Sequence, residues 1–270
     1  MNQVTEIALD TPKMIARKEG HIGWIVFNNP ERRNALSLDM WSAVADIMQR
    51  YQEDDEVRVA VMTGAGDKAF ISGADISEFE KHRASAEAEE NYNRVSTKAQ
   101  AALEAFDKPL VAMIRGFCIG GGLAVALQAD IRIATEDSQF AIPAARLGLG
   151  YGFGGLKKLV HLVGPAMAKE ILFTARRFSS EEALFIGLVN RIVPGDALEA
   201  TVRALAETIS DNAPLTVRTA KATISETLKD PADRDLEEIE RMVRVCFDSE
   251  DYAEGRRAFM EKRRPEFKGR

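Results

Sequence analysis

Cysteine and histidine are scarce in this chain of 270 residues. Only Cys118 and Cys246 occur, and they are too few and too far apart for a disulfide framework or a thiolate metal site. His21, His82 and His161 share no ligand spacing, so we expect no metal centre. Because no histidine follows Cys118 closely enough to activate a thiolate, we expect a small buried residue there.

Long hydrophobic runs are missing as well. No apolar segment approaches the roughly 20 residues that a bilayer-spanning helix needs. The first 20 residues contain three acids and no apolar core, so neither a secretory signal nor a transit peptide is evident, and a cytoplasmic location is the default expectation. The net charge is −6 and the pI is near 5.4, which argues against a nucleic-acid partner. We expect no membrane partner either.

The composition is that of an ordinary globular protein, with 46% hydrophobic and 29% charged residues. The length suits one core with an appended helical tail. We therefore divide the chain into a core, residues 1–195, and a C-terminal helical region, residues 196–270.

Strand and helix patterns alternate through the core. Apolar runs predict strands at 14–18, 21–28 and 57–63, and apolar residues on one helical face predict a helix over 38–54. A short strand at 69–71 is expected to re-enter the sheet. This rhythm of strand, strand and helix recurs further along the chain, and it favours stacked β-β-α turns of a spiral over a doubly wound sheet.

Capping residues, glycines and prolines indicate where helices begin and end. Asn34 and Ser37 are candidate caps of the first long helix. Residues 78–106 are acidic and alanine-rich, and they are predicted to form a solvated helix pair over a ligand pocket. After Pro165 the pattern is mostly helical. Breaks are expected at Gly187, Gly195, Pro214, Pro231 and Gly255.

Two glycine-bearing segments carry the strongest functional signal. Residues 70–76 read FISGADI, and residues 119–123 read IGGGL. A triple glycine that opens an apolar helix leaves unpaired N–H groups and the positive end of the helix dipole free of blocking side chains. Backbone donors from both segments can therefore serve one developing oxyanion.

These segments resemble the crotonase superfamily, the enoyl-CoA hydratase and isomerase group. Further matches, in order along the chain, are NP at 29–30, RNAL at 33–36, ADIRIA at 129–134 and EKRRPEF at 261–267. The resemblance implies an α/β fold with a crotonase-like β-β-α spiral core, followed by C-terminal helices that serve a homotrimer or a dimer of trimers. It also implies an acyl-CoA thioester as substrate and no separate cofactor, since coenzyme A belongs to the substrate.

The resemblance assigns roles to individual residues. The amides of Ala74 and Gly121 would form the oxyanion hole for the thioester carbonyl. Lys262 or Phe259 would reach the ligand of a neighbouring subunit. The other implied substrate contacts are Arg33, Ala35, Leu36, Lys68, Asp75, Ile76, Gly120, Ala124 and Ala144. For the charged residues among them the alternative is a solvated surface position, and Asp75 more readily caps a helix that begins near Ser77.

The usual proton carriers are absent. Hydratases of the family carry one glutamate two residues after the triple glycine and another directly after the proline of an FGQP-like segment, where this chain has Ala124 and Ala144. Residues 108–129 and 138–156 contain no Asp, Glu or His at all. Because hydration needs groups that take and deliver protons, we expect poor hydratase activity.

Three functions remain open. The leading one is an acyl-CoA enzyme of the family, a lyase or isomerase that stabilises a thioester enolate. The second is a decarboxylase, in which loss of CO₂ generates the enolate without a base and Tyr151 orients the departing carboxylate. The third is a CoA-thioester-binding protein without catalysis. Tyr151 is a candidate because its segment resembles that of methylmalonyl-CoA decarboxylase, a relative that has a tyrosine in its pocket. The alternative is a hydrogen-bonded tyrosine that only lines the pocket.

The segment 150–155, GYGFGG, also fits the dinucleotide pattern G-x-G-x-x-G. No apolar strand precedes it, whereas a nucleotide-binding βαβ unit opens with one. We therefore interpret these glycines as a pocket wall or a close-packed turn.

Overall fold

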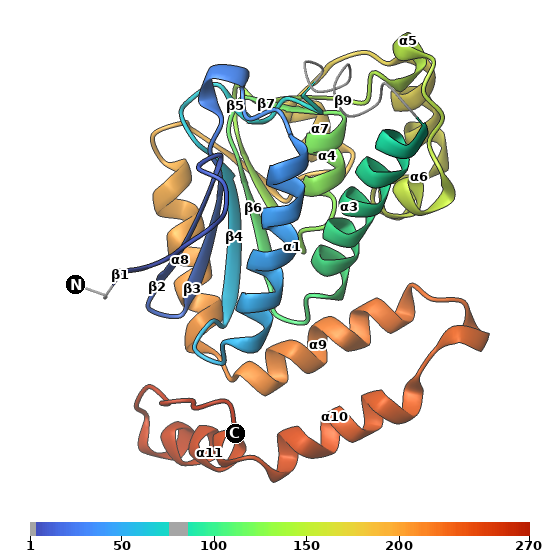
Figure 1. Cartoon of the computed structure of the whole chain (residues 1–270). Coiled ribbons are helices and arrows are strands. Elements are labelled where there is room, and N and C mark those ends of the chain that lie inside the picture. Colours follow the sequence, from blue (N-terminus) through green and yellow to red (C-terminus); the bar gives the residue numbers. More distant parts are fainter. Residues whose placement is uncertain (1–3, 76–85) are drawn as a thin grey trace.

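The structure is a computed structural model that describes residues 4–75 and 86–270 (Figure 1). Its larger sheet has seven strands in the order β1-β2-β3-β4-β6-β8-β11. In chain order these are β1 (Val4–Ile7), β2 (Met14–Glu19), β3 (Ile22–Phe27), β4 (Val59–Gly64), β6 (Leu110–Ile114), β8 (Ile131–Thr135) and β11 (Arg191–Val193). The pairs from β3 to β11 are parallel, and the pairs among β1, β2 and β3 are antiparallel.

A second sheet has four strands in the order β10-β9-β7-β5. They are β5 (Ala69–Ile71), β7 (Phe117–Ile119), β9 (Gln139–Ala141) and β10 (Phe178–Ser179). The expectation that 69–71 re-enters the first sheet is therefore wrong. The chain instead passes repeatedly from a strand of the large sheet to a strand of the small one, and after β7 and β9 into a helix. This alternation confirms the β-β-α spiral.

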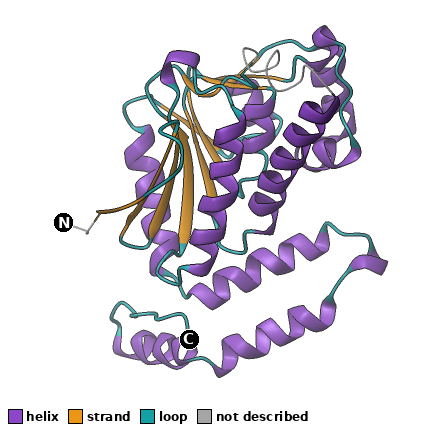
Figure 2. Cartoon of the chain, viewed as in Figure 1, coloured by secondary structure: helices purple, strands orange, loops and turns teal. Residues whose placement is uncertain are grey.

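Helices surround the sheets and are joined by loops and turns (Figure 2). They are α1 (Leu38–Glu53), α3 (Ala86–Ala105), α4 (Gly121–Ala126), α5 (Ala144–Leu147), α6 (Phe153–Thr174), α7 (Ser180–Phe185), α8 (Leu198–Asp211), α9 (Pro214–Thr227), α10 (Leu236–Asp248) and α11 (Glu250–Glu261), with short 3₁₀ turns η1 (Pro30–Arg32) and η3 (Pro231–Asp233). Pro214 begins α9, a position that proline favours. Gly255 lies inside α11, so the break expected there is wrong.

The large sheet is buried on both faces. On β3, Ile25 and Phe27 pack in the cluster that includes α1, whereas Ile22 and Trp24 pack in the cluster that includes α8. Successive residues of a strand point to opposite faces, which explains why β3 is an unbroken apolar run. Helix α8 lies beyond residue 195 yet covers this sheet. In its packing, α8 belongs with the core. Whether residues 1–195 and 196–270 are separate folding units stays a prediction.

Helices α9, α10 and α11 extend below the sheet (Figure 1). They are tied to the core near the chain end, because the Arg58 guanidinium donates to the carbonyl of Ser210 at 3.0 Å and to that of Phe267 at 2.8 Å. Within residues 4–75 and 86–270, no helix is both long and apolar enough to cross a bilayer. Of the predicted helix pair over 78–106, residues 86–105 form α3, and residues 78–85 lie outside the described part.

Helix α4 sits unusually close to β5, and Gly122 makes this approach possible. A Cβ on Gly122 would lie 2.2 Å from the carbonyl oxygen of Ile71 and 2.7 Å from its Cβ. On the neighbouring Gly121 a Cβ would meet no atom nearer than 3.6 Å. The packing of α4 on the strand therefore depends on Gly122, and Gly121 has room for a small side chain.

We predict that Gly122→Ala lowers the free energy of unfolding by about 1–3 kcal/mol or more, because backbone atoms of Ile71 cannot move aside as a side chain can. Equilibrium urea unfolding at one protein concentration measures it. Gly121→Ala is the matched control and should unfold at the parent's urea midpoint or slightly above it. Equal midpoints for Gly122→Ala and the parent would contradict this account of the packing.

Candidate active site

Three parallel strands bring the predicted site segments to one edge of the small sheet. Strands β5, β7 and β9 pair in parallel, so their carboxyl ends lie together. The chain leaves β5 into Gly73 and Ala74, leaves β7 into Gly120 and Gly121, and leaves β9 toward Pro143 and Ala144. Segments that are far apart in the sequence thus meet.

The Ala74 amide is held in a short bridge with the segment Ala35–Leu36. Leu36 N–H donates to the Gly73 carbonyl at 2.8 Å, and Asp75 N–H donates to the Leu36 carbonyl at 2.8 Å. In such a parallel bridge the residue between the two bonded positions directs its own N–H away from the partner strand. Ala74 N–H therefore faces away from Leu36.

The Gly121 amide lies beside it. Gly121 is the first residue of α4, and the first N–H groups of a helix have no partner within the helix. Gly120 precedes it at φ 53°, ψ −114°, a conformation that favours glycine. A Cβ on Gly121 would lie 3.8 Å from the Ala74 nitrogen. Position 121 and the nitrogen of Ala74 are therefore close neighbours.

Ala124 and Ala144 lie close in sequence to the ends of β7 and β9. Gly121 and Ala124 of α4 keep partial exposure, whereas the other four residues of this helix are buried, so these two lie on its open face. Ala144 begins α5 and is 6% exposed. Its neighbour Pro143 lies within 3.7 Å of a Cβ placed on Gly120. Both alanines thus lie in the helices that follow β7 and β9, α4 and α5.

One carboxylate enters this region. Asp75 is the only acid in the segments 72–75, 120–124 and 142–147 that follow the three strands. It is largely buried, and its carboxylate lies 3.8 Å from the Arg32 guanidinium. The proposed helix start near Ser77, and the implied contact at Ile76, lie outside the described residues.

Tyr151 lies in the loop between α5 and α6. It is half-buried against the main core cluster, and burial raises the pKa of its phenol. The side chain is therefore protonated at neutral pH and can donate a hydrogen bond. The glycine pattern at 150–155 follows helix α5, not a strand, so it is no dinucleotide-binding turn.

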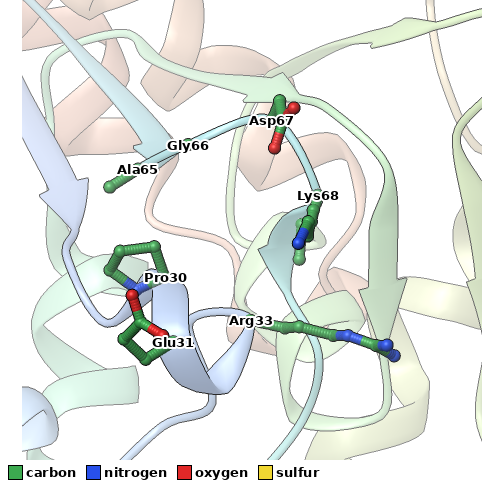
Figure 3. Close-up of a pocket in the computed structure, with 8 residues that line it drawn as sticks. Pro30, Glu31, Arg33, Ala65, Gly66, Asp67 and Lys68 are labelled. Atoms are coloured by element: carbon green, nitrogen blue, oxygen red, sulfur yellow. The ribbon is translucent and has the colours of Figure 1, made fainter.

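Arg33 and Lys68 line one pocket of about 330 Å³ between η1 and the turn after β4. Figure 3 shows both side chains toward one side of it and Pro30 and Glu31 toward the other. The Arg33 guanidinium lies 5.3 Å from the centre of the Phe117 ring, a cation–π contact. Glu31 and Asp67 line the same hollow, so its two cations share it with two acids.

Asn34 is a residue that sequence reasoning misjudged. It caps no helix: its side-chain amide donates to the carbonyls of Ala65 at 3.0 Å and Ala69 at 2.8 Å, and its oxygen accepts from the Asn29 N–H at 3.0 Å. Arg33 and Asn34 both have positive φ, a conformation in which Asn is enriched. Asn34 thus positions the segment that leads to Leu36.

Two expected contacts lie elsewhere in the chain. Phe259 and Lys262 are at the end of α11, at the opposite end of the molecule from β5 and β7 (Figure 1). Within one chain they are not part of this site. Cys118 is fully buried, and burial raises the pKa of its thiol, which confirms a packing role.

The comparisons with known proteins agree with this architecture. A family model described as enoyl-CoA hydratase/isomerase matches residues 17–270. The chain belongs to this family, within the crotonase superfamily. A short-chain-enoyl-CoA hydratase of Clostridium acetobutylicum is 36% identical over 97% of this chain and 100% of its own length.

Other family members are similarly close. A crotonyl-CoA hydratase of Syntrophomonas wolfei is 36% identical over 94% of this chain and 97% of its own. The crystal structure of an enoyl-CoA hydratase/carnithine racemase from Magnetospirillum magneticum has a TM-score of 0.91 at 38% identity, with 97% of each chain covered. The crotonase fold and an enzyme of this family are thereby shown.

Proposed function

We propose that the protein binds an acyl-CoA thioester and stabilises its enolate through the amides of Ala74 and Gly121. The observation that supports this proposal is the short distance, 3.8 Å, between a Cβ placed on Gly121 at the start of α4 and the nitrogen of Ala74, whose N–H faces away from Leu36. A preorganised donor of this kind is worth roughly 2.7 to 4 kcal/mol of barrier. The named relatives act on enoyl-CoA thioesters, which supports the same substrate class.

The coenzyme A part fits the neighbouring hollow. Arg33 and Lys68 supply charge for its phosphates, and Ala35, Leu36 and Asp75 form the strand segment beside Ala74 along which the pantetheine would lie. Gly120 leaves room for that arm because it has no side chain. Lys262 and Phe259 serve this ligand only from a neighbouring copy, since they lie far from it in their own chain.

Plain hydration is poorly supported by the side chains at the site. Adding water across a double bond requires a proton to leave water and another to reach the α-carbon, and each general acid or base contributes roughly 10² to 10⁴-fold. Ala124 and Ala144 supply neither. We therefore expect this protein to stabilise an enolate as its family does. We expect hydration of the double bond to be slow.

Decarboxylation is the second candidate, and Tyr151 favours it. When the bond between the α-carbon and a carboxylate breaks, its electron pair stays on the thioester as the enolate and CO₂ leaves, so no base is needed. A proton from water then completes the product. The protonated phenol of Tyr151 can orient the carboxylate by donating a hydrogen bond. A CoA-thioester-binding protein without turnover is the third candidate.

The C-terminal helices support a homotrimer or a dimer of trimers. Several large apolar side chains on α10 and α11 are exposed: Val243, Val245, Phe247, Tyr252, Phe259 and Met260. An apolar groove of about 700 Å³ runs between α9, α10 and α11. Exposed apolar surface of this extent marks an interface, and the number of copies follows from the family resemblance.

Gly121→Pro tests the oxyanion hole. Proline suits the first position of a helix, and glycine at position 120 has no Cβ to clash with its ring, so the change removes one N–H donor with little strain. A conjugated thioester such as cinnamoyl-CoA should shift its absorption to longer wavelength on the parent and lose that shift on the variant. Gly121→Ala keeps the N–H and should keep the shift. Coenzyme A alone should bind all three proteins. A full shift on Gly121→Pro would exclude the proposed hole.

Ala124→Glu with Ala144→Glu tests the missing acids. If the backbone donors are in place, the double variant should gain or raise crotonyl-CoA hydratase activity. Ala124 is on the open face, but a glutamate that turns inward would suffer a desolvation penalty, so unfolding must be measured with the rate. The account fails if the folded double variant is no faster, or if the parent already hydrates crotonyl-CoA at about 1 to 10³ per second.

Tyr151→Phe tests the second candidate. Turnover of the true substrate should fall while thioester affinity stays nearly unchanged, because only one hydroxyl is removed from a half-buried ring. Assays on malonyl-type thioesters, with CO₂ release as readout, measure it. Equal rates in parent and variant would leave Tyr151 as a wall residue only.

Static light scattering tests the assembly. At micromolar concentration the protein should have three or six times the 29.8 kDa mass of one chain. A mass equal to one chain would overturn the trimer, and with it the contribution of Phe259 and Lys262 to a neighbouring site.

A further inference from the structure

The Ala74 N–H is aimed by the peptide group to which it belongs. The peptide bond between Gly73 and Ala74 is trans, so this N–H and the Gly73 carbonyl point in opposite directions. That carbonyl accepts a hydrogen bond from the Leu36 N–H at 2.8 Å. A carbonyl that accepts a bond polarises its peptide group, which makes the N–H of the same group a stronger donor. The position of Leu36 therefore sets both the direction and the strength of the Ala74 donor.

Leu36 lies at the end of an irregular loop. After the turn η1, Arg33 and Asn34 both have positive φ angles, of 51° and 56°. Besides the two bonds of Leu36, the Ser72 N–H donates to the Arg33 carbonyl at 3.1 Å. So few backbone bonds do not make a stable strand pair by themselves. The geometry of this contact therefore depends on how the loop itself is held.

One buried side chain holds that loop. Asn34 is 0% exposed, and its amide nitrogen donates to the carbonyls of Ala65 at 3.0 Å and Ala69 at 2.8 Å. Its side-chain oxygen accepts from the Asn29 N–H at 3.0 Å. Ala65 directly follows β4, and Ala69 begins β5. Asn34 thus ties the loop to the very strand that leads into the proposed site.

Close packing leaves the Asn34 amide little room to move. A Cβ on Gly64, the last residue of β4, would lie 2.6 Å from the amide nitrogen of Asn34 and 2.3 Å from the carbonyl oxygen of Ala69. The backbone of β4 therefore packs directly against this amide. Among side chains of this length, the amide alone offers two donors and an acceptor, and both kinds are used here.

We propose that Asn34 is a positioning residue of the oxyanion hole: by holding the loop before Leu36, its side-chain amide fixes the direction and strength of the Ala74 N–H. This inference rests on the proposed function above. Because Asn34 is fully buried, it acts through the bond from Leu36 to the Gly73 carbonyl. An ionised carboxylate in place of the amide would face two carbonyl oxygens with no proton to donate, so the loop, and Leu36 with it, would move.

A purely structural tie is the competing explanation for Asn34. It predicts that replacing Asn34 lowers the free energy of unfolding and nothing else. A variant that still folds would then polarise a bound thioester as strongly as the parent does. The two explanations therefore differ in the electronic state of the bound thioester, which is independent of turnover.

The experiment measures the absorption shift of cinnamoyl-CoA on a saturating concentration of each protein, with folding checked by circular dichroism. At saturation the shift reports polarisation of the thioester carbonyl and does not depend on affinity. On folded Asn34→Asp the shift should be less than half of the parent's. Asn34→Gly tolerates the positive φ and removes all three side-chain bonds, so it should lose a similar share.

Asn28→Asp is the matched control. It makes the same chemical change nearby in the sequence, at an exposed site where the Asn28 amide donates to the Pro12 carbonyl at 2.9 Å. This variant should keep the full shift, because its side chain holds neither Leu36 nor β5.

The outcomes separate this inference from the function on which it rests. If the parent binds no thioester, or if the shift is missing in the parent or survives in Gly121→Pro, the proposed function fails. If the parent shows the shift and Gly121→Pro loses it, a full shift on a folded Asn34 variant overturns this inference alone. Failure of both Asn34 variants to fold, or folded variants that bind no thioester, would make Asn34 a general structural residue and likewise overturn it.

Discussion

The contact between Gly122 and β5 is the constraint on which the site depends. Because no side chain separates α4 from the carbonyl of Ile71, the helix begins beside the turn that carries Ala74. A Cβ at position 122 would move the helix away from the strand, and the Gly121 amide would move with it. In the proposed oxyanion hole, the distance between the amides of Ala74 and Gly121 is thus set by packing inside the core. Preorganisation of this kind costs nothing at the moment of reaction.

Three short strands are enough to assemble the site because they are parallel. Each of β5, β7 and β9 contributes three residues and then a turn. Since β7 lies between β5 and β9, the segment that holds Gly121 is central, with Ala74 on one side and Ala144 on the other. Asn34 locks the neighbouring loop to the start of β5. The backbone of the site is therefore held from several directions, while its side chains are small.

The sequence predicts the long elements better than the short ones. Strand β3 and helix α1 bury whole faces, and their periodic patterns are unmistakable. A strand of three residues such as β5 carries too little pattern to reveal its sheet. The two glycine segments could be recognised because each is a short run of consecutive residues. The role of Asn34 could not be found this way, since its partner Ala69 lies 35 residues away in the sequence.

Ala124 and Ala144 cannot carry a proton, which limits the reactions that the proposed site can favour. Helix α4 has only six residues, so its effect on an oxyanion comes from the unpaired N–H groups of its first turn more than from a long dipole. These donors are neutral and cannot accept a proton. Stabilising an enolate then speeds only those reactions in which the substrate itself releases the electron pair, or in which water carries the proton. In the proposed function these two amides stabilise the enolate, and the functional groups of the acyl chain decide which reaction follows.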